Sequence, residues 1–148
     1  MIAPADDLDL IMAVMASAFD PAYGEAWTRR QVEDALLTGN CHYGLAMHQD
    51  HCAGFYLTRS AFDEEELLLL AVDPQFRRKG IGQQLVNRFK QEARQRGAMR
   101  LFLEMRRGNP AEFLYLKNKF VPVGVRPNYY RTNLGKRLDA ITFKSEIE

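Results

Sequence analysis

The spacing of apolar residues along the chain predicts an alternation of helices and strands. Apolar residues three or four positions apart indicate amphipathic helices, whereas short apolar runs and two-residue alternation indicate strands. Glycine and proline mark many of the ends. The expected order is a helix over 6–19, a helix from the capping box 28–31 to about 39, strands at 41–48 and 51–61, an acidic turn at 63–66, a strand at 67–72, a helix from just after 82 to 97, a strand at 99–105, a helix at 110–118, and strands at 121–125 and 139–143 joined by a long loop.

The most informative segment joins a strand to a helix through a basic loop that contains glycine. The apolar run 67–72 predicts a buried strand, and Asp73-Pro74 ends it because proline has no N–H to donate. Cations and glycines follow at 77–82, and an amphipathic helix begins at once. This arrangement points backbone N–H groups and the positive end of a helix dipole at one spot. It predicts a phosphate or pyrophosphate site, although a solvated basic turn is the alternative.

The basic loop differs from two common phosphate-binding motifs. A P-loop would need a serine or threonine that is missing after Gly82, and the dinucleotide motif would need a glycine where Leu85 stands. Residues 77–82 do match the pattern Arg/Gln-x-x-Gly-x-Gly. With this pattern, a strand before it and a long helix after it, the segment resembles the acetyl-CoA loop of the GNAT N-acetyltransferase superfamily.

Composition and charge exclude several other classes of protein. The 148 residues are 47% hydrophobic and 26% charged, which is typical of one globular domain. A net charge of +1 gives no general attraction to nucleic acid or to a membrane surface. The chain shows no secretory leader and no apolar run long enough to span a membrane. We therefore expect a single domain over 1–148, a cytoplasmic location, and no direct nucleic-acid or membrane partner.

Two cysteines and three histidines lie close together in the sequence but do not predict a disulfide or a metal site. In a hairpin of 41–48 and 51–61, Cys52 lies near the turn and Cys41 lies about 20 Å away near the far end. A disulfide needs Cα atoms within about 7 Å of each other. Histidines around a turn are more typical of a polar surface than of zinc ligands. We therefore expect no metal.

Several short motifs carry a closer resemblance. Together with the order of elements, they make the chain most similar to the bacterial ribosomal-protein-alanine N-acetyltransferases of the GNAT superfamily. The resemblance implies an α/β (α+β) GNAT acyltransferase fold, with a mixed central sheet and helices on both faces. The motifs are Ala-Trp-Thr at 26–28, Leu-Ala-Val-Asp-Pro at 70–74, Leu-Glu-Met-Arg at 103–106, Asn109, Leu-Tyr at 114–115, Asn-Tyr-Tyr at 128–130 and Asp-Ala-Ile at 139–141.

The same resemblance implies an activity and a partner. Members of this family transfer acetyl from acetyl-CoA to the α-amino group of a protein N-terminus, and the expected acceptor is a small-subunit ribosomal protein that begins with alanine. The chain departs from the family pattern at Lys119, at Pro127 and in the loop before Asp139. Because the last two departures fall where an acceptor would lie, acetylation of a small amine or amino acid stays open as a second hypothesis. A third hypothesis is a non-catalytic acyl-CoA-binding module.

Two residues are candidates for proton transfer. An amine must lose a proton to attack a thioester, and an α-amino group with a pKa near 8 needs only a modest base. Alternation along 99–105 places Glu104 on the same face as Phe102, where a carboxylate beside apolar neighbours suits a general base. The resemblance assigns proton acceptance to Glu104 and proton donation to the CoA sulfur to Tyr115. The alternatives are a solvated glutamate at the end of a strand and a core tyrosine.

The resemblance also indicates where the two substrates bind. Backbone groups at the end of the strand would bind pantetheine, the loop and helix start would hold the pyrophosphate, and Asn109 would contact pantetheine or cap a helix. Aromatic side chains would form the acceptor groove, or else pack between helices and the last strands. The cofactor candidates are Leu70, Ala71, Val72, Arg78, Lys79, Gly80, Ile81, Gly82, Gln83 and Asn109, and the acceptor candidates are Trp27, Tyr129 and Tyr130.

Overall fold

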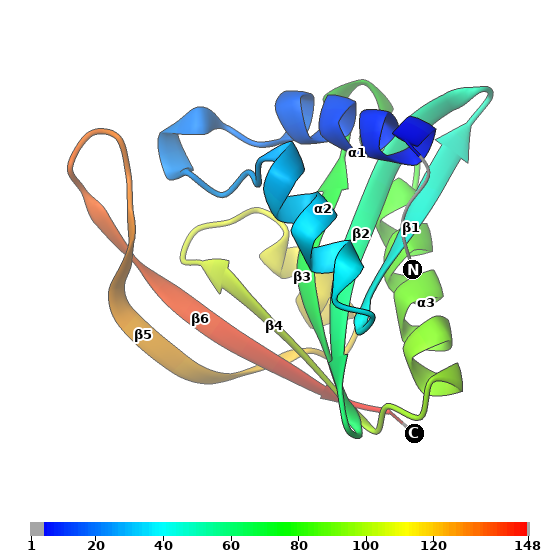
Figure 1. Cartoon of the computed structure of the whole chain (residues 1–148). Helices are drawn as coiled ribbons and strands as arrows, with labels where there is room; N and C mark the ends of the chain where they lie inside the picture. The colour runs from blue at the N-terminus through cyan, green and yellow to red at the C-terminus, as the bar shows by residue number, and fades with distance from the viewer. Residues whose placement is uncertain (1–4, 148) are drawn as a thin grey trace.

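The computed structural model describes residues 5–147 and builds them around one six-stranded sheet of order β1-β2-β3-β4-β6-β5 (Figure 1). Strands β3 and β4 are parallel, whereas the other neighbours are antiparallel, so the sheet is mixed as expected. The strands are β1 (Cys41–His48), β2 (His51–Ala61), β3 (Glu64–Val72), β4 (Arg100–Arg106), β5 (Val121–Arg131) and β6 (Arg137–Glu146). The α-helices are α1 (Ala5–Ala18), α2 (Arg29–Leu37), α3 (Ile81–Gln95) and α4 (Glu112–Lys117).

Helices cover both faces of the sheet, which confirms the predicted fold class. On one face, α1 and α2 bury Ile11 and Val32 against Phe55 of β2. On the other face, α3 buries Phe89 against a separate cluster that also contains Tyr115 of α4 (Figure 1). Burying apolar area on both faces is the main stabilising contribution to such a layered fold. Among the described helices, none is both long and apolar enough to cross a membrane.

Local sequence signals place most element boundaries correctly. The predicted capping box starts α2, because Gln31 N donates to Thr28 Oγ1 at 3.2 Å and Thr28 N donates to Gln31 Oε1 at 2.7 Å. In the β1–β2 hairpin, Cys52 pairs with Met47 near the turn and Cys41 pairs with Arg59 far from it. Both cysteines are free thiols and lie at opposite ends of the hairpin, which is the placement that the sequence predicts.

Four predicted boundaries are wrong, and three of them have a clear physical reason. The acidic segment 63–66 is mostly the start of β3, because its glutamates pair with arginines instead of forming a turn. Helix α3 begins at Ile81, two residues earlier than expected, since Gly80 already serves as its N-cap. Helix α4 is shorter than 110–118. The long loop expected before 139 is largely strand, because a bulge at Pro127 interrupts β5 without ending it.

Strands β3 and β4 pair only at their beginnings. Their parallel register runs from Glu64 opposite Arg100 to Leu67 opposite Leu103 and stops there. A β-bulge follows at once, since Thr58 of β2 pairs with Leu67 and Leu57 pairs with Leu69. Beyond this bulge the two strands diverge (Figure 1). The divergence leaves one edge of β3 without a strand partner and opens a gap in the middle of the sheet.

Candidate active site

Two cavities meet at the gap between β3 and β4. The α2-side cavity, of about 410 Å³, lies between Trp27 at the start of α2, Glu104 of β4 and Tyr130 of β5. The α3-side cavity, of about 670 Å³, lies between the end of β3, the start of α3 and the segment that leads into α4. Crevices where neighbouring strands separate are common ligand sites. The residues that line both cavities are Phe19, Glu25, Leu70, Asn109 and Tyr115.

The start of α3 presents free backbone donors to the α3-side cavity. Gly80, with a φ of 77°, turns the chain into the helix, and Gln84 N makes the first bond of the helix to Gly80 O at 3.0 Å. The N–H groups of residues 81–83 therefore have no partner within the helix. A Cβ on Gly82 would lie 3.2 Å from Leu114 Cδ2, so glycine keeps this approach open. Free N–H groups and the helix dipole together form a place for an anion.

Eight of the ten cofactor candidates line the α3-side cavity, and two do not. Lys79 is exposed on the loop and lies outside the lining. The amide of Gln83 points to α4, where it exchanges hydrogen bonds of 2.8 and 2.9 Å with the amide of Asn118. Asn109 accepts a bond from Ala111 N at 2.9 Å just before α4, so it caps that turn while it also lines both cavities. The lining candidates are Leu70, Ala71, Val72, Arg78, Gly80, Ile81, Gly82 and Asn109.

The Gln83–Asn118 amide pair fastens α4, which carries Tyr115, to α3. We expect Gln83→Ala to lower the free energy of unfolding by about 1–2 kcal/mol, since it removes both hydrogen bonds to Asn118 and a partly exposed one to Asn87. It should also lower kcat more than it raises KM for acetyl-CoA, because the backbone donors at the start of α3 remain. Urea unfolding and steady-state kinetics measure both effects, with the exposed neighbour Gln84→Ala as control. An equal effect of the two substitutions would contradict this role.

Glu104 lies on β4 and lines the α2-side cavity. As alternation predicts, it shares a face with Phe102, and its side chain is 19% exposed. Its surroundings are more polar than expected, because β5 and β6 bring polar groups to it: Arg126 Nε lies 3.1 Å from Oε2, and Thr142 Oγ1 donates to the same oxygen at 3.4 Å. The other oxygen, Oε1, has no hydrogen-bond partner within residues 5–147. The carboxylate is therefore oriented by two neighbours and keeps one oxygen for a ligand.

Tyr115 lies where the two cavities join. Its ring is buried and packs edge-on against Phe120, with centroids 5.9 Å apart. Burial, reinforced by the charge of Glu25, raises the pKa of the Tyr115 phenol above its ordinary value. The hydroxyl therefore stays protonated at neutral and mildly alkaline pH. In the part of the chain that the structure describes, no group forms a hydrogen bond with this hydroxyl, so it can donate to a ligand in the cavities.

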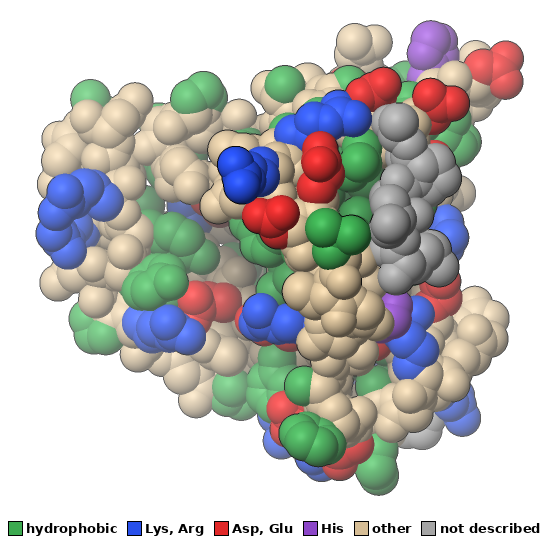
Figure 2. Space-filling model, viewed as in Figure 1, with side chains coloured by type: hydrophobic (Ala, Val, Ile, Leu, Met, Phe, Trp, Pro, Cys, Tyr) green, Lys and Arg blue, Asp and Glu red, His purple; other side chains and the backbone are tan. Residues whose placement is uncertain are grey.

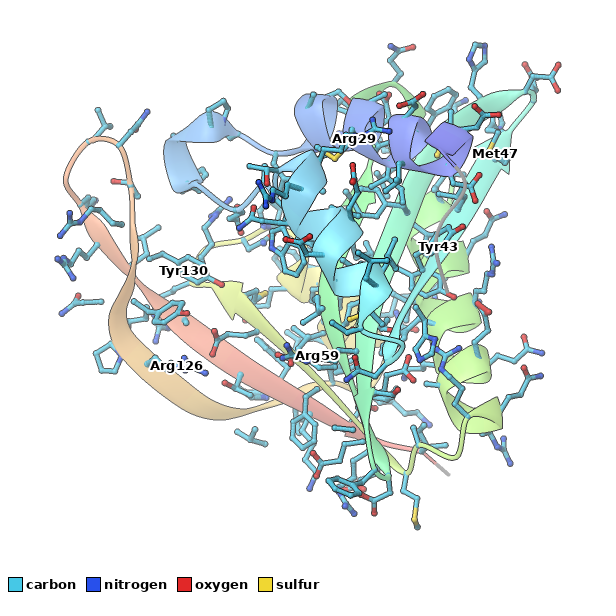
Figure 3. The ribbon with its side chains drawn as sticks, viewed as in Figure 1. Arg29, Tyr43, Met47, Arg59, Arg126 and Tyr130 are labelled. Atoms are coloured by element: carbon cyan, nitrogen blue, oxygen red, sulfur yellow. The ribbon has the colours of Figure 1, made fainter. Side chains whose placement is uncertain are left out.

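The three predicted acceptor-site aromatics all line the α2-side cavity. Trp27 also packs against the core on the α1–α2 face, so both of its expected roles fit its position. The rings of Tyr129 and Tyr130 are perpendicular, with centroids 5.2 Å apart. Burial, with the nearby charges of Glu104 and Glu25, raises the pKa of Tyr130 to about 12. Figure 3 shows Tyr130 and Arg126 on the same side of the opening, with Arg59 on the far side.

A carboxylate bridge holds the bulge that precedes these tyrosines. Asn128 takes a φ of 54°, and its backbone N–H donates to Asp139 Oδ1 at 3.0 Å. Arg107 Nε donates to the other oxygen of Asp139 at 3.2 Å. The Asn128 N–H, with help from Arg107, holds the pKa of Asp139 below its usual range. The motifs Asn-Tyr-Tyr and Asp-Ala-Ile are thus joined in space, and together they position Tyr129 and Tyr130 at the cavity.

One further group at the junction was not predicted from the sequence. Glu25, in the loop before α2, pairs with Arg106 at the end of β4, with Arg106 Nε donating to Glu25 Oε1 at 3.1 Å. The Arg106 guanidinium carbon lies 3.6 Å from the centroid of the Tyr23 ring. A single glutamate in an irregular loop carries no periodic signal, and only the Leu-Glu-Met-Arg motif marked Arg106. Their meeting depends on contacts far apart in the sequence.

Comparison with known proteins identifies the family of the chain. Residues 9–120 match the Acetyltransferase (GNAT) family, and the chain belongs to that family. A Bacillus subtilis protein, provisionally assigned as a ribosomal protein bS18-alanine N-acetyltransferase, is 30% identical over 130 residues, which cover 86% of this chain and 83% of that protein. The Salmonella typhimurium ribosomal protein bS18-alanine N-acetyltransferase is 40% identical over 93 residues, which cover 62% of each chain.

The solved structures agree with the sequence relatives. The crystal structure of the Escherichia coli ribosomal-protein-S18-alanine N-acetyltransferase superposes with a TM-score of 0.87 at 28% identity, and covers 100% of this chain and 92% of that one. The resemblance to the ribosomal-protein-alanine N-acetyltransferases, the GNAT fold and the assignment as an acetyltransferase are therefore confirmed. The matched segment spans less than two thirds of the Salmonella protein's own length.

Proposed function

We propose that residues 1–148 act as one N-acetyltransferase domain, which transfers acetyl from acetyl-CoA to the N-terminal α-amino group of a protein. The observation that carries the proposal is the junction at the β3–β4 gap. An anion-binding helix start lies on one side of it, and a carboxylate and a protonated phenol line the other. The names of the relatives point to a ribosomal protein that begins with alanine as the acceptor.

The α3-side cavity fits the cosubstrate. Its volume of about 670 Å³ lies within the usual range for small-molecule sites. The pyrophosphate would accept hydrogen bonds from the N–H groups at the start of α3, with Arg78 beside it. The pantetheine amides would bind the edge of β3 that has no strand partner, at residues 68–72. Acetyl-CoA then supplies an activated acyl group, whose carbonyl carbon would lie at the gap.

Residues at the junction would carry out the two proton transfers of the reaction. Glu104 would take a proton from the acceptor amine, directly or through one water, so that the nitrogen lone pair can attack the thioester. A carbon–nitrogen bond forms and the carbon–sulfur bond breaks. Tyr115 would give a proton to the departing sulfur and recover it from solvent. Protons and electrons balance without an oxidant or a reductant.

Turnover with a panel of acceptors tests the proposal. The panel contains hexapeptides that begin with alanine, serine or methionine, together with free amino acids and polyamines, and products are read by mass spectrometry. We expect acetylation of the α-amino group, fastest on the peptides that begin with alanine. Acetylation of free amines but of no peptide would support a small-amine acetyltransferase instead. Tight acetyl-CoA binding without turnover on any acceptor would overturn the assigned activity.

Replacing Tyr115 with phenylalanine tests the proton donor. We expect kcat to fall by about 100-fold, the lower end of the range for a positioned general acid, because the sulfur would leave without a proton from the enzyme. The fall should be smaller for a thioester with a more acidic thiol, whose departure needs less help. Acetyl-CoA affinity should stay unchanged, since the ring and its packing on Phe120 are kept. The matched control is Tyr43→Phe, which removes a hydroxyl that bonds Asp7 outside both cavities.

A further inference from the structure

Glu25 is the one carboxylate, among the described residues, that lines both cavities. Glu104 lines only the α2-side cavity, whereas Glu25 also reaches the α3-side cavity, where the thioester would end. The two carboxylates come from different elements, a loop before α2 and strand β4. An amine that attacks at the gap would therefore approach between them.

The Glu25 side chain is held in place through one of its two carboxylate oxygens. Arg106 binds its Oε1 at 3.1 Å, and the two side chains are 14% and 12% exposed. Arg106 in turn is stacked on the Tyr23 ring, so the loop cannot move Glu25 without breaking its ion pair with Arg106 or this stacking contact. The second oxygen, Oε2, has no hydrogen-bond partner within residues 5–147, and it is not among the buried atoms left unsatisfied. It is thus open to the cavities.

The side chains that line the α2-side cavity offer carboxylate oxygens to a cationic ligand. Its lining contains three carboxylates, Glu25, Glu66 and Glu104, and no described lysine, arginine or histidine. Each carboxylate also pairs with an arginine outside this lining, and the pairs are Glu25–Arg106, Glu66–Arg59 and Glu104–Arg126. In the space-filling view the opening beside β5 and β6 is a hollow with acidic and basic side chains at its edge (Figure 2). The same negative charge helps to raise the pKa of both Tyr115 and Tyr130.

We infer that Glu25, through Oε2, binds the α-ammonium group of the acceptor and holds it beside Glu104. This inference rests on the proposed function and adds a residue that recognises the substrate. An α-amino group with a pKa near 8 arrives mostly protonated at neutral pH, so a carboxylate is its natural partner. The acetylated product is neutral and loses this partner. Glu25 therefore gives the site a preference for substrate over product.

A pair of peptides tests this role directly. One is a hexapeptide that begins with alanine, and the other is the same peptide with an acetylated N-terminus. Each is titrated calorimetrically at pH 6.5 into protein saturated with CoA. We expect Glu25→Gln to weaken binding of the free-amine peptide by about 10-fold, as for loss of a charged hydrogen bond, and to leave binding of the acetylated peptide unchanged. The glutamine side-chain oxygen can still accept from Arg106, so the loop should keep its place.

Controls separate recognition from a loss of structure. Glu33→Gln breaks a similar glutamate–arginine pair, of 3.1 Å to Arg29, on the exposed side of α2 and should bind both peptides as the wild type does. If Glu25→Gln unfolds, Glu25→Asp keeps the charge at a shorter reach and should lose part of the same preference. Equal weakening for both peptides, or none, would overturn the inference. A wild type that neither binds nor acetylates the peptide would overturn the proposed function, and this inference with it.

Discussion

Glu104→Gln should slow acetyl transfer by about 100- to 10,000-fold, the range expected for loss of a general base. Glutamine has the same shape and can still accept from Thr142 and Arg126, so the local structure should persist. It cannot take a proton from the amine. Because Glu104 does not line the α3-side cavity, acetyl-CoA affinity should stay within about twofold of the wild type. Single-turnover rates and calorimetric titration measure the two quantities.

The pH dependence of the Glu104→Gln rate gives a second test of the same role. Without a base on the enzyme, the variant depends on acceptor that is already deprotonated, so its rate should rise with pH up to the amine pKa near 8. The matched control is Glu64→Gln on β3, which removes an exposed carboxylate outside both cavities. A Glu104→Gln rate close to that of the wild type at pH 7 would exclude Glu104 as the proton acceptor, whatever the control shows.

The parts of the site that the sequence predicts are those whose signal is local. Residues 67–82 contain a buried strand, a proline stop, a glycine at positive φ and an amphipathic helix, and each signal comes from neighbours in the chain. The anion-binding geometry therefore follows from the sequence almost directly. Side-chain direction is less local: Gln83 lies in the motif, yet its amide points to Asn118 because that residue, far away in the chain, lies beside it.

The acceptor side could be predicted only in part, because it forms from distant segments. Alternation gives the face of Glu104, but not Arg126, which β5 brings to within 3.1 Å of it. Strands were predicted at 121–125 and 139–143, but the full length of β5 and β6 was not, because Pro127 and the left-handed Asn128 break the alternation that marks a strand. Glu25 was missed because its role depends on Arg106, 81 positions away in the sequence.

A buried ion pair anchors the sheet just before the β3–β4 gap. Glu65 of β3 has a fully buried side chain, and the guanidinium of Arg96, next to the end of α3, binds both of its oxygens at 2.9 and 2.6 Å. Nothing in the acidic run 63–66 distinguishes Glu65 from its neighbours, since only the pleat and the position of α3 decide which glutamate is covered. The pair lies within the short stretch where β3 and β4 are hydrogen-bonded.

Arg96→Ala should therefore lower the free energy of unfolding by about 3–5 kcal/mol, because it leaves a carboxylate buried without its partner. Replacing both residues, as Glu65→Leu with Arg96→Met, should recover most of this loss, since no buried charge then remains. Arg29→Ala breaks pairs to Asp9 and Glu33 on the surface and should destabilise the protein much less than Arg96→Ala does. Urea unfolding at pH 7 compares these three variants with the wild type. If Arg96→Ala were no more destabilised than Arg29→Ala, the Glu65–Arg96 pair would not anchor α3 to the sheet, and the gap would have to be held open by the bulge in β3 alone.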